Sequence, residues 1–504
     1  MMLETLADLL VSRPALSNRT ALLFGDEAFT YAELESRSNQ VANALIAQNI
    51  QSGDFVCQAV GSRPELIVNL FGILKSGARY APLNPSLTER ELSEQLTDCQ
   101  PVVLIAEDEV AQKLRSPPAS ARGLRVWRLG EWAAECRRMP DKRPSRELDP
   151  EGPALLFYTS GSSGRSKGVQ VAHEQVLMNA RQVLERTDAG PEDRLLVVMP
   201  VFHANGFCNQ VVLPLLAGAS IALRPRFVGD EFWSEVARYR PTYFTAVPTI
   251  MSRLLEGPEI PPAAERSSLR FVRTGAAPLS LELQQRFESR FELPVISSYG
   301  LTEATCTVTM NPATREGRRL GSVGKVLDGL ELMVLGEDNS ARLAREVGEI
   351  AVRGPTIMLG YRGLPEATAE AIQDGWLRTG DLGYVDEDGY LFLTDRKKDI
   401  IIRGGENISS REIEEVLTAH PLVAEAAVVG MPDAQYGEQV VAFVVLRDRV
   451  SSPKSVEAAL LAHCRARLAR FKVPVLIEPM NDLPKNSIGK VLKQVLRELV
   501  KGPR

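Results

Sequence analysis

The amino-acid sequence predicts an α/β protein that is built from more than one domain. The chain has 504 residues, of which 44% are hydrophobic, whereas a single core stops growing at roughly 250–300 residues. Short apolar runs alternate along the chain with amphipathic stretches, a pattern typical of strands and helices in turn. Alternation over this length indicates parallel sheets that are covered by helices on both faces.

The first half of the chain supplies the clearest elements. Residues 32–48 place apolar side chains at helical spacing, and Val102–Ala106 is typical of a buried strand. Leu195–Met199 and Thr242–Val247 are apolar in the same way and predict two further strands. We interpret the more polar region Ser116–Pro153 as a surface connection.

One segment, Leu195–Leu223, contains no acidic or basic residue and is long enough to span a bilayer. Pro200, His203, Pro214 and several amide residues interrupt it, so we interpret it as a buried strand, a loop and a core helix. The first residues also lack the basic-then-apolar layout of a secretory signal. The sequence therefore predicts a soluble, cytoplasmic protein with no membrane span.

The sequence pattern changes beyond about Gly321, where short alternating strands are separated by turn residues as in a small antiparallel barrel. Residues 411–433 then indicate a helix, a turn and a strand. We place the boundary in the charged run Asp395–Asp399. This gives an N-terminal region of residues 1–395, a hinge at 396–399 and a C-terminal domain of residues 400–504.

Charge and cysteine content exclude several classes of protein. The chain has 59 basic and 64 acidic residues and a formal net charge of -5, which argues against a nucleic-acid partner or a polybasic membrane anchor. Its six cysteines are scattered without CxxC pairs. That usage is typical of a reducing compartment and predicts neither a disulfide framework nor a zinc site.

The strongest local motif is YTSGSSGRSKG, Tyr158–Gly168, which follows the apolar run ALLF. Small, hydroxylated and glycine residues after a strand let backbone amides and hydroxyls surround phosphate oxygens. The motif does not align with GxxxxGK[ST] of nucleotide-binding P-loops. Taken alone, it fits a flexible surface turn better than a phosphate-binding loop.

The second motif is SSYGLTE, Ser297–Glu303, which follows a short apolar run. A tyrosine here can stack on a base while the acidic residue faces phosphates through Mg²⁺, which prefers oxygen ligands. The alternative is a strand end with a capping Thr-Glu pair.

Two further motifs lie towards the C-terminus. Gly375–Leu391 places Asp381 in a glycine-flanked turn, where its carboxylate can accept both hydroxyls of a ribose with Arg396 nearby. Leu483–Lys490, LPKNSIGK, ends in a lysine. The alternatives are a surface hairpin for the former and a solvated lysine for the latter.

These four blocks, in this order, resemble the adenylate-forming superfamily of acyl-CoA synthetases, carrier-loading adenylation domains and luciferases. The resemblance runs from Thr30–Leu34 and Leu74–Pro85 to Lys490, nearly the whole chain. It implies a large N-terminal region of two α/β subdomains plus a small β-barrel, with a smaller mobile α+β C-terminal domain. It also implies an enzyme that uses ATP and Mg²⁺ to form an acyl-adenylate and then transfers the acyl group to coenzyme A.

The resemblance also assigns site residues. The implied catalytic residues are Lys490, His203, Thr302 and Glu303, and the implied metal ligands are Thr159 and Glu303. The implied cofactor-binding residues are Thr159, Ser160, Gly161, Ser162, Ser163, Gly164, Lys167, Gly275, Ala276, Ala277, Ser298, Tyr299, Gly300, Asp381, Arg396, Lys398, Gly404, Gly405 and Glu406.

By the same resemblance, each group has its own role. Residues 159–164 and Lys167 hold the β- and γ-phosphates, and Tyr299 flanks adenine. Lys490 bridges the incoming carboxylate and the α-phosphate, and Lys398 is the pivot about which the C-terminal domain rotates between the two half-reactions. His203 stands where family members place an aromatic or histidine gate near the carboxylate.

The acid and the acceptor are less sharply defined. Amino-acid adenylation domains place an aspartate where this chain has His203, which argues against an α-amino acid substrate. Asn205, Asn209 and Gln210 make the pocket segment more polar than a long fatty acid requires, which favours a small or medium acid. Two other functions remain open: a stand-alone enzyme that loads a carrier protein, and a non-catalytic acyl or nucleotide sensor. The sequence does not indicate the oligomeric state.

Overall fold

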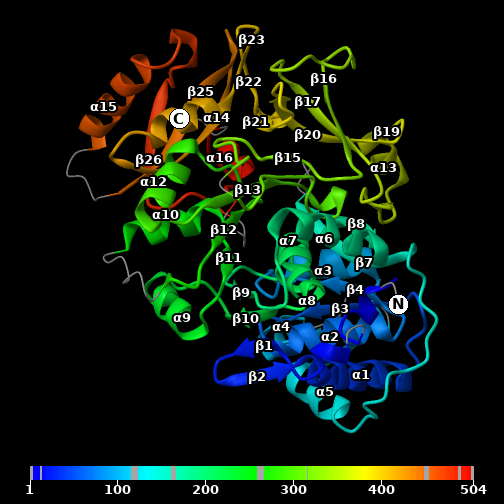
Figure 1. Cartoon of the computed structure of the whole chain (residues 1–504). Coiled ribbons are helices and arrows are strands. Elements are labelled where there is room, and N and C mark those ends of the chain that lie inside the picture. Colours follow the sequence, from blue (N-terminus) through cyan, green and yellow to red (C-terminus); the bar gives the residue numbers. More distant parts are fainter. Residues whose placement is uncertain are drawn as a thin grey trace.

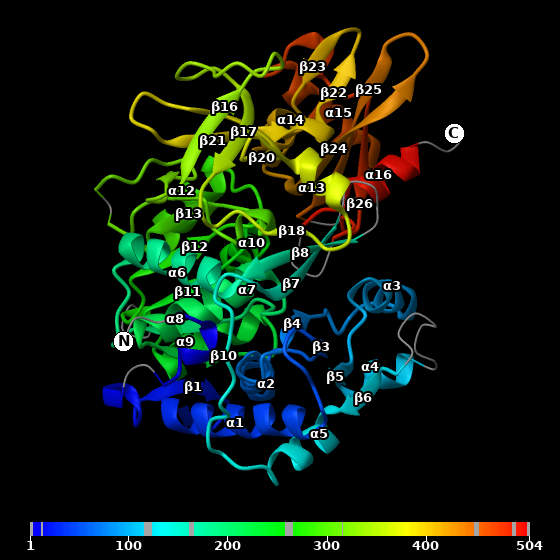
Figure 2. The ribbon, with the colours of Figure 1, turned by 90° about the vertical axis from the view of Figure 1, so that its right-hand side faces the viewer.

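The computed structural model describes residues 4–11, 14–114, 123–160, 166–257, 266–314, 316–447, 453–485 and 490–500. Within these ranges the chain forms two α/β layers, an antiparallel sheet and a C-terminal α+β unit. The N-terminal elements lie at one end of the molecule and the C-terminal elements at the other (Figure 1). The view from the side shows the same separation (Figure 2).

The first α/β layer is a mainly parallel sheet. Its strands, in spatial order, are β18 (Gly360–Tyr361), β8 (Ser166–Ala172), β7 (Pro153–Ser160), β4 (Arg79–Pro82), β3 (Phe55–Ala59), β5 (Val103–Ala106) and β6 (Arg125–Arg128). Its helices are α1 (Tyr31–Ala47), α2 (Pro64–Lys75), α3 (Glu89–Cys99), α4 (Asp108–Lys113) and α5 (Leu129–Cys136). Val56 of β3 packs in the cluster that contains α2, whereas its neighbour Cys57 packs with α3, so helices cover both faces.

The second α/β layer is a longer sheet. Its strands, in order, are β15 (Lys325–Val326), β14 (Thr309–Met310), β13 (Val295–Tyr299), β12 (Phe271–Thr274), β11 (Tyr243–Thr245), β9 (Arg194–Val197), β10 (Ser220–Leu223), β1 (Thr20–Phe24) and β2 (Glu27–Thr30). Successive strands from β13 to β1 pair in parallel. Its helices are α6 (His173–Thr187), α7 (Ala204–Phe207), α8 (Leu213–Ala217), α9 (Phe232–Tyr239), α10 (Pro248–Glu256) and α12 (Leu281–Phe291).

The antiparallel sheet stands where the sequence predicts the small barrel. It consists of β16 (Glu331–Leu335), β17 (Gly348–Arg353), β20 (Trp376–Val385), β19 (Ile372–Gln373) and β21 (Leu391–Arg396), with helix α13 (Pro365–Ala371) beside it. Asp381 and Arg396 are paired residues of β20 and β21.

The C-terminal unit has hydrophobic clusters of its own, which include Ile401, Val428 and Leu460 in one and Phe443 and Leu496 in the other. Its strands are β23 (Glu406–Ile408), β22 (Ile401–Arg403), β25 (Gly437–Leu446), β24 (Val423–Asp433) and β26 (Leu476–Met480). Its helices are α14 (Ser410–Thr418), α15 (Pro453–Arg465) and α16 (Lys493–Val500).

The structure also tests the interpretation of individual segments. Leu195–Leu223 folds as buried strand, loop and core helix, as expected, and no described helix combines the length and apolarity needed to cross a membrane. The interpretation of Ser116–Pro153 as surface connection is wrong for residues 125–136, whereas residues 137–152 form neither helix nor strand. β6 and α5 form there because α5 buries Trp132, whose indole Nε1 donates to Asn69 Oδ1 at 3.1 Å.

Candidate active site

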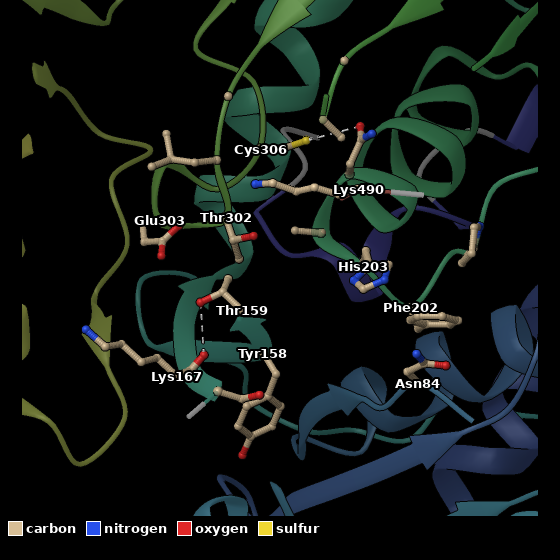
Figure 3. A pocket seen from close by; sticks show the side chains of 18 of the residues that line it. Asn84, Tyr158, Thr159, Lys167, Phe202, His203, Thr302, Glu303, Cys306 and Lys490 are labelled. Carbon is tan, nitrogen blue, oxygen red and sulfur yellow. Dashed lines mark hydrogen bonds between the residues drawn. The ribbon is translucent and has the colours of Figure 1, made fainter. Parts of the chain in front are cut away.

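A large cavity lies where the two α/β layers, the antiparallel sheet and the C-terminal unit meet. Its volume is about 1340 Å³, which exceeds the roughly 300–1,000 Å³ of a pocket for one small ligand. The carboxyl ends of β12 and β13 open into it, the position at which open α/β sheets bind ligands. Figure 3 shows Thr159, His203, Glu303 and Lys490 around this space.

Most of the site residues predicted from the sequence line this cavity. They are Thr159, Lys167, His203, Gly275, Ala276, Ser298, Tyr299, Gly300, Thr302, Glu303, Arg396, Lys398 and Lys490. Ala277 and Asp381 are not in the lining, and Gly404, Gly405 and Glu406 lie in an exposed turn outside it. Ser160 ends β7, and the predicted phosphate-binding residues Gly161, Ser162, Ser163 and Gly164 lie outside the described residues.

Tyr299, Asp381 and Arg396 form a connected group on one side of the cavity. The Tyr299 hydroxyl donates to Asp381 Oδ2 at 2.8 Å, and Arg396 Nε lies 2.9 Å from Asp381 Oδ1. Burial, with the Asp381 charge beside it, raises the pKa of Tyr299 well above its ordinary value, so the phenol stays a donor. The group fixes a carboxylate that can accept the vicinal hydroxyls of a sugar.

A second group reaches from the β7–β8 hairpin to Glu303. Lys167 pairs with Thr159 across the hairpin, and its ammonium lies 4.7 Å from the centre of the Tyr361 ring. The Tyr361 hydroxyl in turn donates to Glu303 Oε1 at 3.0 Å. Burial raises the pKa of Tyr361, and the Glu303 carboxylate acts in the same direction. A cation and a carboxylate thus face one space, the arrangement that a Mg²⁺-bound polyphosphate requires.

The donor set fits Mg²⁺ bound together with a nucleotide. Among the described residues there is no group of three or more His, Cys, Asp or Glu side chains that could hold a metal ion by themselves. Mg²⁺ is usually held by one or two carboxylates with waters and substrate phosphates. Glu303, with the Thr159 hydroxyl on the same cavity wall, is such a partial set.

Lys490 enters the cavity from the C-terminal unit. Lys485 anchors its segment through Glu425 and Asp482, and the Leu492 amide donates to Pro484 O at 2.8 Å. Burial lowers the pKa of Lys490 to about 8, and the Arg396 cation acts in the same direction. The ammonium is therefore protonated at neutral pH and poorly solvated, which makes it a strong ligand for an incoming anion.

Lys398 lies in the turn Lys397–Asp399 that follows β21, next to the C-terminal unit. Arg497 of α16 ties this turn down, because its Nη2 donates to Asp399 Oδ1 at 2.7 Å and to Lys398 O at 3.1 Å. Burial lowers the pKa of Lys398, and the Arg396 charge adds to this effect. In this arrangement Lys398 and Lys490 both line the cavity.

His203 precedes α7 at the other side of the cavity. Burial lowers its pKa to about 4, so the imidazole is neutral at pH 7. Its ring lies 4.6 Å from that of Phe202. The helix that follows passes into a π-helical segment, Cys208–Val212, which the sequence did not predict and which is common at functional sites.

Close backbone approach explains two glycines of the site. A Cβ atom on Gly300 would lie 1.7 Å from Cys306 O, and one on Gly206 would lie 2.2 Å from Pro200 O. Ala276, which lines the cavity, has φ of 65°, a left-handed conformation that costs an alanine energy and is found at ligand sites.

Sequence reasoning missed several cavity residues. Tyr361 hydrogen-bonds Glu303 from 58 positions away, so no local pattern reveals it. Arg273, which lies behind the cavity wall and not in its lining, interrupts the apolar strand β12, and this is the signal that could have drawn attention to it. Glu349 and Arg378, from the antiparallel sheet, also line the cavity and carry no motif.

Comparison with known families agrees with this geometry. Residues 13–362 match the model of the AMP-binding enzyme family, and residues 412–490 match the AMP-binding enzyme C-terminal domain. The chain therefore belongs to the AMP-binding enzyme family, within the adenylate-forming superfamily.

Individual relatives are CoA ligases by name. The chain is 35% identical over 499 residues to a sulfoacetate–CoA ligase of Cupriavidus necator, covering 97% of this chain and 96% of that one. It is 37% identical over 481 residues to a feruloyl-CoA synthase of an Amycolatopsis species, covering 95% of each. ATP-bound MatB from Rhodopseudomonas palustris superimposes with a TM-score of 0.93 at 30% identity, with 99% of each chain covered. The anthranilate CoA ligase AuaEII, in complex with anthranoyl-AMP, gives a TM-score of 0.91 at 28% identity, with 99% and 97% covered.

Proposed function

We propose that this chain is a carboxylate–CoA ligase that forms an acyl-adenylate from ATP and then passes the acyl group to coenzyme A. The observation that carries the proposal is the single cavity shared by Lys490, the Thr159–Lys167 hairpin, Glu303 and the Tyr299–Asp381–Arg396 group. Carboxylate, sugar hydroxyls and phosphates each find a matching partner in it.

In the first half-reaction a carboxylate oxygen attacks the α-phosphorus of ATP, and the bond to the pyrophosphate oxygen breaks. Negative charge grows on the phosphoryl oxygens, so positioning and electrostatic stabilisation carry the catalysis. Lys490 holds the carboxylate against the phosphate, and Lys167 and Thr159 hold the outer phosphates. Glu303 would hold Mg²⁺, which would neutralise part of the phosphate charge. No general base is needed, because the acid is already ionised.

In the second half-reaction the coenzyme A thiol, as thiolate, attacks the acyl carbon, and AMP leaves. Lys490 lines the cavity in this arrangement. We propose that residues 400–504 rotate as a domain about residues 396–399, with Lys398 as the pivot, so that Lys490 withdraws and a thiol can enter. The rest of the chain, residues 1–395, holds the adenylate. Rotation would bring the exposed turn Gly404–Glu406 to the cavity as part of a thiol channel. The neutral His203 lies on the acyl side and gates access to it.

The names of the relatives do not identify the acid that this chain uses. They include ligases for sulfoacetate and oxalate, which carry a second anionic group, and for ferulate and indoleacetate, which do not. The proposal therefore needs an acid panel that covers aliphatic, aromatic, dicarboxylic and betaine-type compounds.

The test measures AMP and pyrophosphate release across this panel, with and without coenzyme A. The proposal predicts that AMP release depends on both an acid and coenzyme A. Pyrophosphate exchange without turnover by coenzyme A would instead point to a carrier-protein acceptor. Absence of both activities with every acid would contradict adenylate formation and favour a sensor.

A further inference from the structure

Behind the acyl side of the cavity lies a buried cation, Arg273, which forms no salt bridge with an acidic side chain in the part of the chain that the structure describes. Arg273 lies on β12 and is 2% exposed, and its Nη2 donates to Asn209 Oδ1 at 3.2 Å. Its Nε and Nη1 have no hydrogen-bond partner in the described part of the chain. A guanidinium does not deprotonate in proteins, so burial leaves it charged and under-solvated. Such a group costs several kcal/mol unless something pairs with it.

Arg273 is separated from the cavity wall by Asn209, through two successive hydrogen bonds. Asn209 Nδ2 donates to Asn205 Oδ1 at 2.7 Å and to Cys306 Sγ at 2.9 Å, and it lies 3.3 Å from Thr307 Oγ1. Asn205, Cys306 and Thr307 all line the cavity. Figure 3 shows Cys306 on the wall of the pocket that also holds Lys490 and His203.

Other polar atoms near this cation are also unsatisfied. The Thr245 hydroxyl, on the residue paired with Arg273 in the sheet, has no partner among the described residues. The same holds for both amide atoms of Gln210, which is fully buried in the π-helical segment next to Asn209. Buried polar groups are normally hydrogen-bonded, and exceptions call for an unseen partner such as a ligand or water. Here the unsatisfied atoms include two charged donors of Arg273, Nε and Nη1, which favours an anionic partner.

We propose that Arg273, with Asn209 and Asn205, binds a second anionic group at the far end of the substrate, so that the acid is a short dianion. This rests on the proposed function: Lys490 takes the reacting carboxylate and Arg273 takes the distal one. The relay through Asn209 lets the guanidinium act on a group that enters between Asn205, Cys306 and Thr307. A carboxylate or a sulfonate suits this place, because the fixed positive charge of Arg273 lies behind it and acts through Asn209.

One internal group competes with this assignment. Hydrogen bonding, first with Cys208, lowers the pKa of the Cys306 thiol, and the Arg273 charge acts in the same direction. A Cys306 thiolate would neutralise Arg273 without any substrate. Cys306→Ser removes that anion, and the proposal predicts that the preference for dianionic acids survives the change.

The test compares matched acids that differ only in distal charge, such as succinate with succinamate and malonate with malonamate, by pyrophosphate exchange. In the unaltered protein, kcat/KM for the dianion should exceed that for its amide by on the order of 100-fold. Arg273→Met should abolish this preference and leave kcat/KM for the amides within about threefold of its value in the unaltered protein. Arg270→Met is the matched control, because Arg270 precedes the same strand and pairs at the surface with Asp193 at 2.7 Å. It should keep the preference.

Asn209→Asp tests the same site while retaining Arg273. The new carboxylate pairs with the guanidinium, so the melting temperature should rise while dianionic acids lose on the order of 100-fold in kcat/KM. The proposal is overturned if amides and dianions are used equally, or if Arg273→Met and Asn209→Asp keep the preference. Pyrophosphate exchange with monoanionic acids alone would refute a dianionic substrate and would still support adenylate formation. No exchange with any acid would refute both.

Discussion

Two buried lysines in different regions have similarly lowered pKa values but lie in different surroundings. Burial lowers the pKa of Lys75, at the end of α2, and of Lys490, in the cavity, to about 8 in each case. Lys75 is enclosed by acceptors: Glu35 Oε2 at 2.5 Å, Ser38 Oγ at 2.7 Å and Asn39 Oδ1 at 2.9 Å. Lys490 instead lines a large cavity, with the cations Arg396 and Lys398 and the carboxylates Asp381 and Asp399 nearby. A shifted pKa therefore does not by itself identify a catalytic lysine. What distinguishes Lys490 is that it lines a cavity that can admit an anion.

The largest expected effect is on Lys490. Lys490→Ala should lower adenylate formation by about 10³-fold, because one preorganised donor to a developing charge is worth about that much. Thiol transfer from a supplied acyl-adenylate should change little. Single-turnover assays of the two half-reactions measure this, and equal loss in both would contradict the role given to Lys490.

The matching change at Lys75 should affect stability instead. Lys75→Met leaves the Glu35 carboxylate buried without its cation and should cost about 3 kcal/mol in the free energy of unfolding. Activity per folded molecule should be unchanged. Denaturant unfolding gives the first quantity, and the double variant Lys75→Met/Glu35→Gln should recover much of the loss. A specific loss of adenylation in folded Lys75→Met would break the comparison.

A third change separates the two half-reactions at the hinge. Lys398→Pro fixes φ near −65° and should slow thioester formation by roughly 100-fold if the backbone at this residue must change between steps. The rate of adenylate formation should stay within about threefold of that of the unaltered protein. The neighbouring Lys397→Pro is the control. Unchanged thioester formation in Lys398→Pro would remove Lys398 as the pivot.

The smallest effect concerns pH. The protonated form of Lys490 is the active one, so kcat/KM for adenylation should be full below pH 8 and fall about tenfold per unit as pH rises above it. Lys490→Arg should move this limb to higher pH, whereas Lys75→Met should leave it in place. If this decline in kcat/KM moved with Lys75→Met, the titrating group would be Lys75, and its assignment to Lys490 would be wrong.

The sequence predicted what depends on local pattern. The strands Val103–Ala106, Arg194–Val197 and Tyr243–Thr245 and the four motifs could be found because apolar runs and glycine-rich turns are contiguous. Helix α5 was missed because the reason for it, the bond from Trp132 to Asn69, joins residues 63 positions apart. Arg273 was missed for the same reason: only the fold shows that two donors of this arginine lack a partner among the described residues and that it lies behind the acyl pocket.

The most direct test of the account is to identify the intermediate. The protein is mixed with ATP, Mg²⁺ and an accepted acid without coenzyme A, and the bound species is analysed by mass spectrometry after quenching. The account predicts acyl-AMP in near-stoichiometric amount, which converts to acyl-CoA and AMP when coenzyme A is added. Formation of ADP and phosphate, or of acyl-CoA with no acyl-AMP at any time, would contradict it.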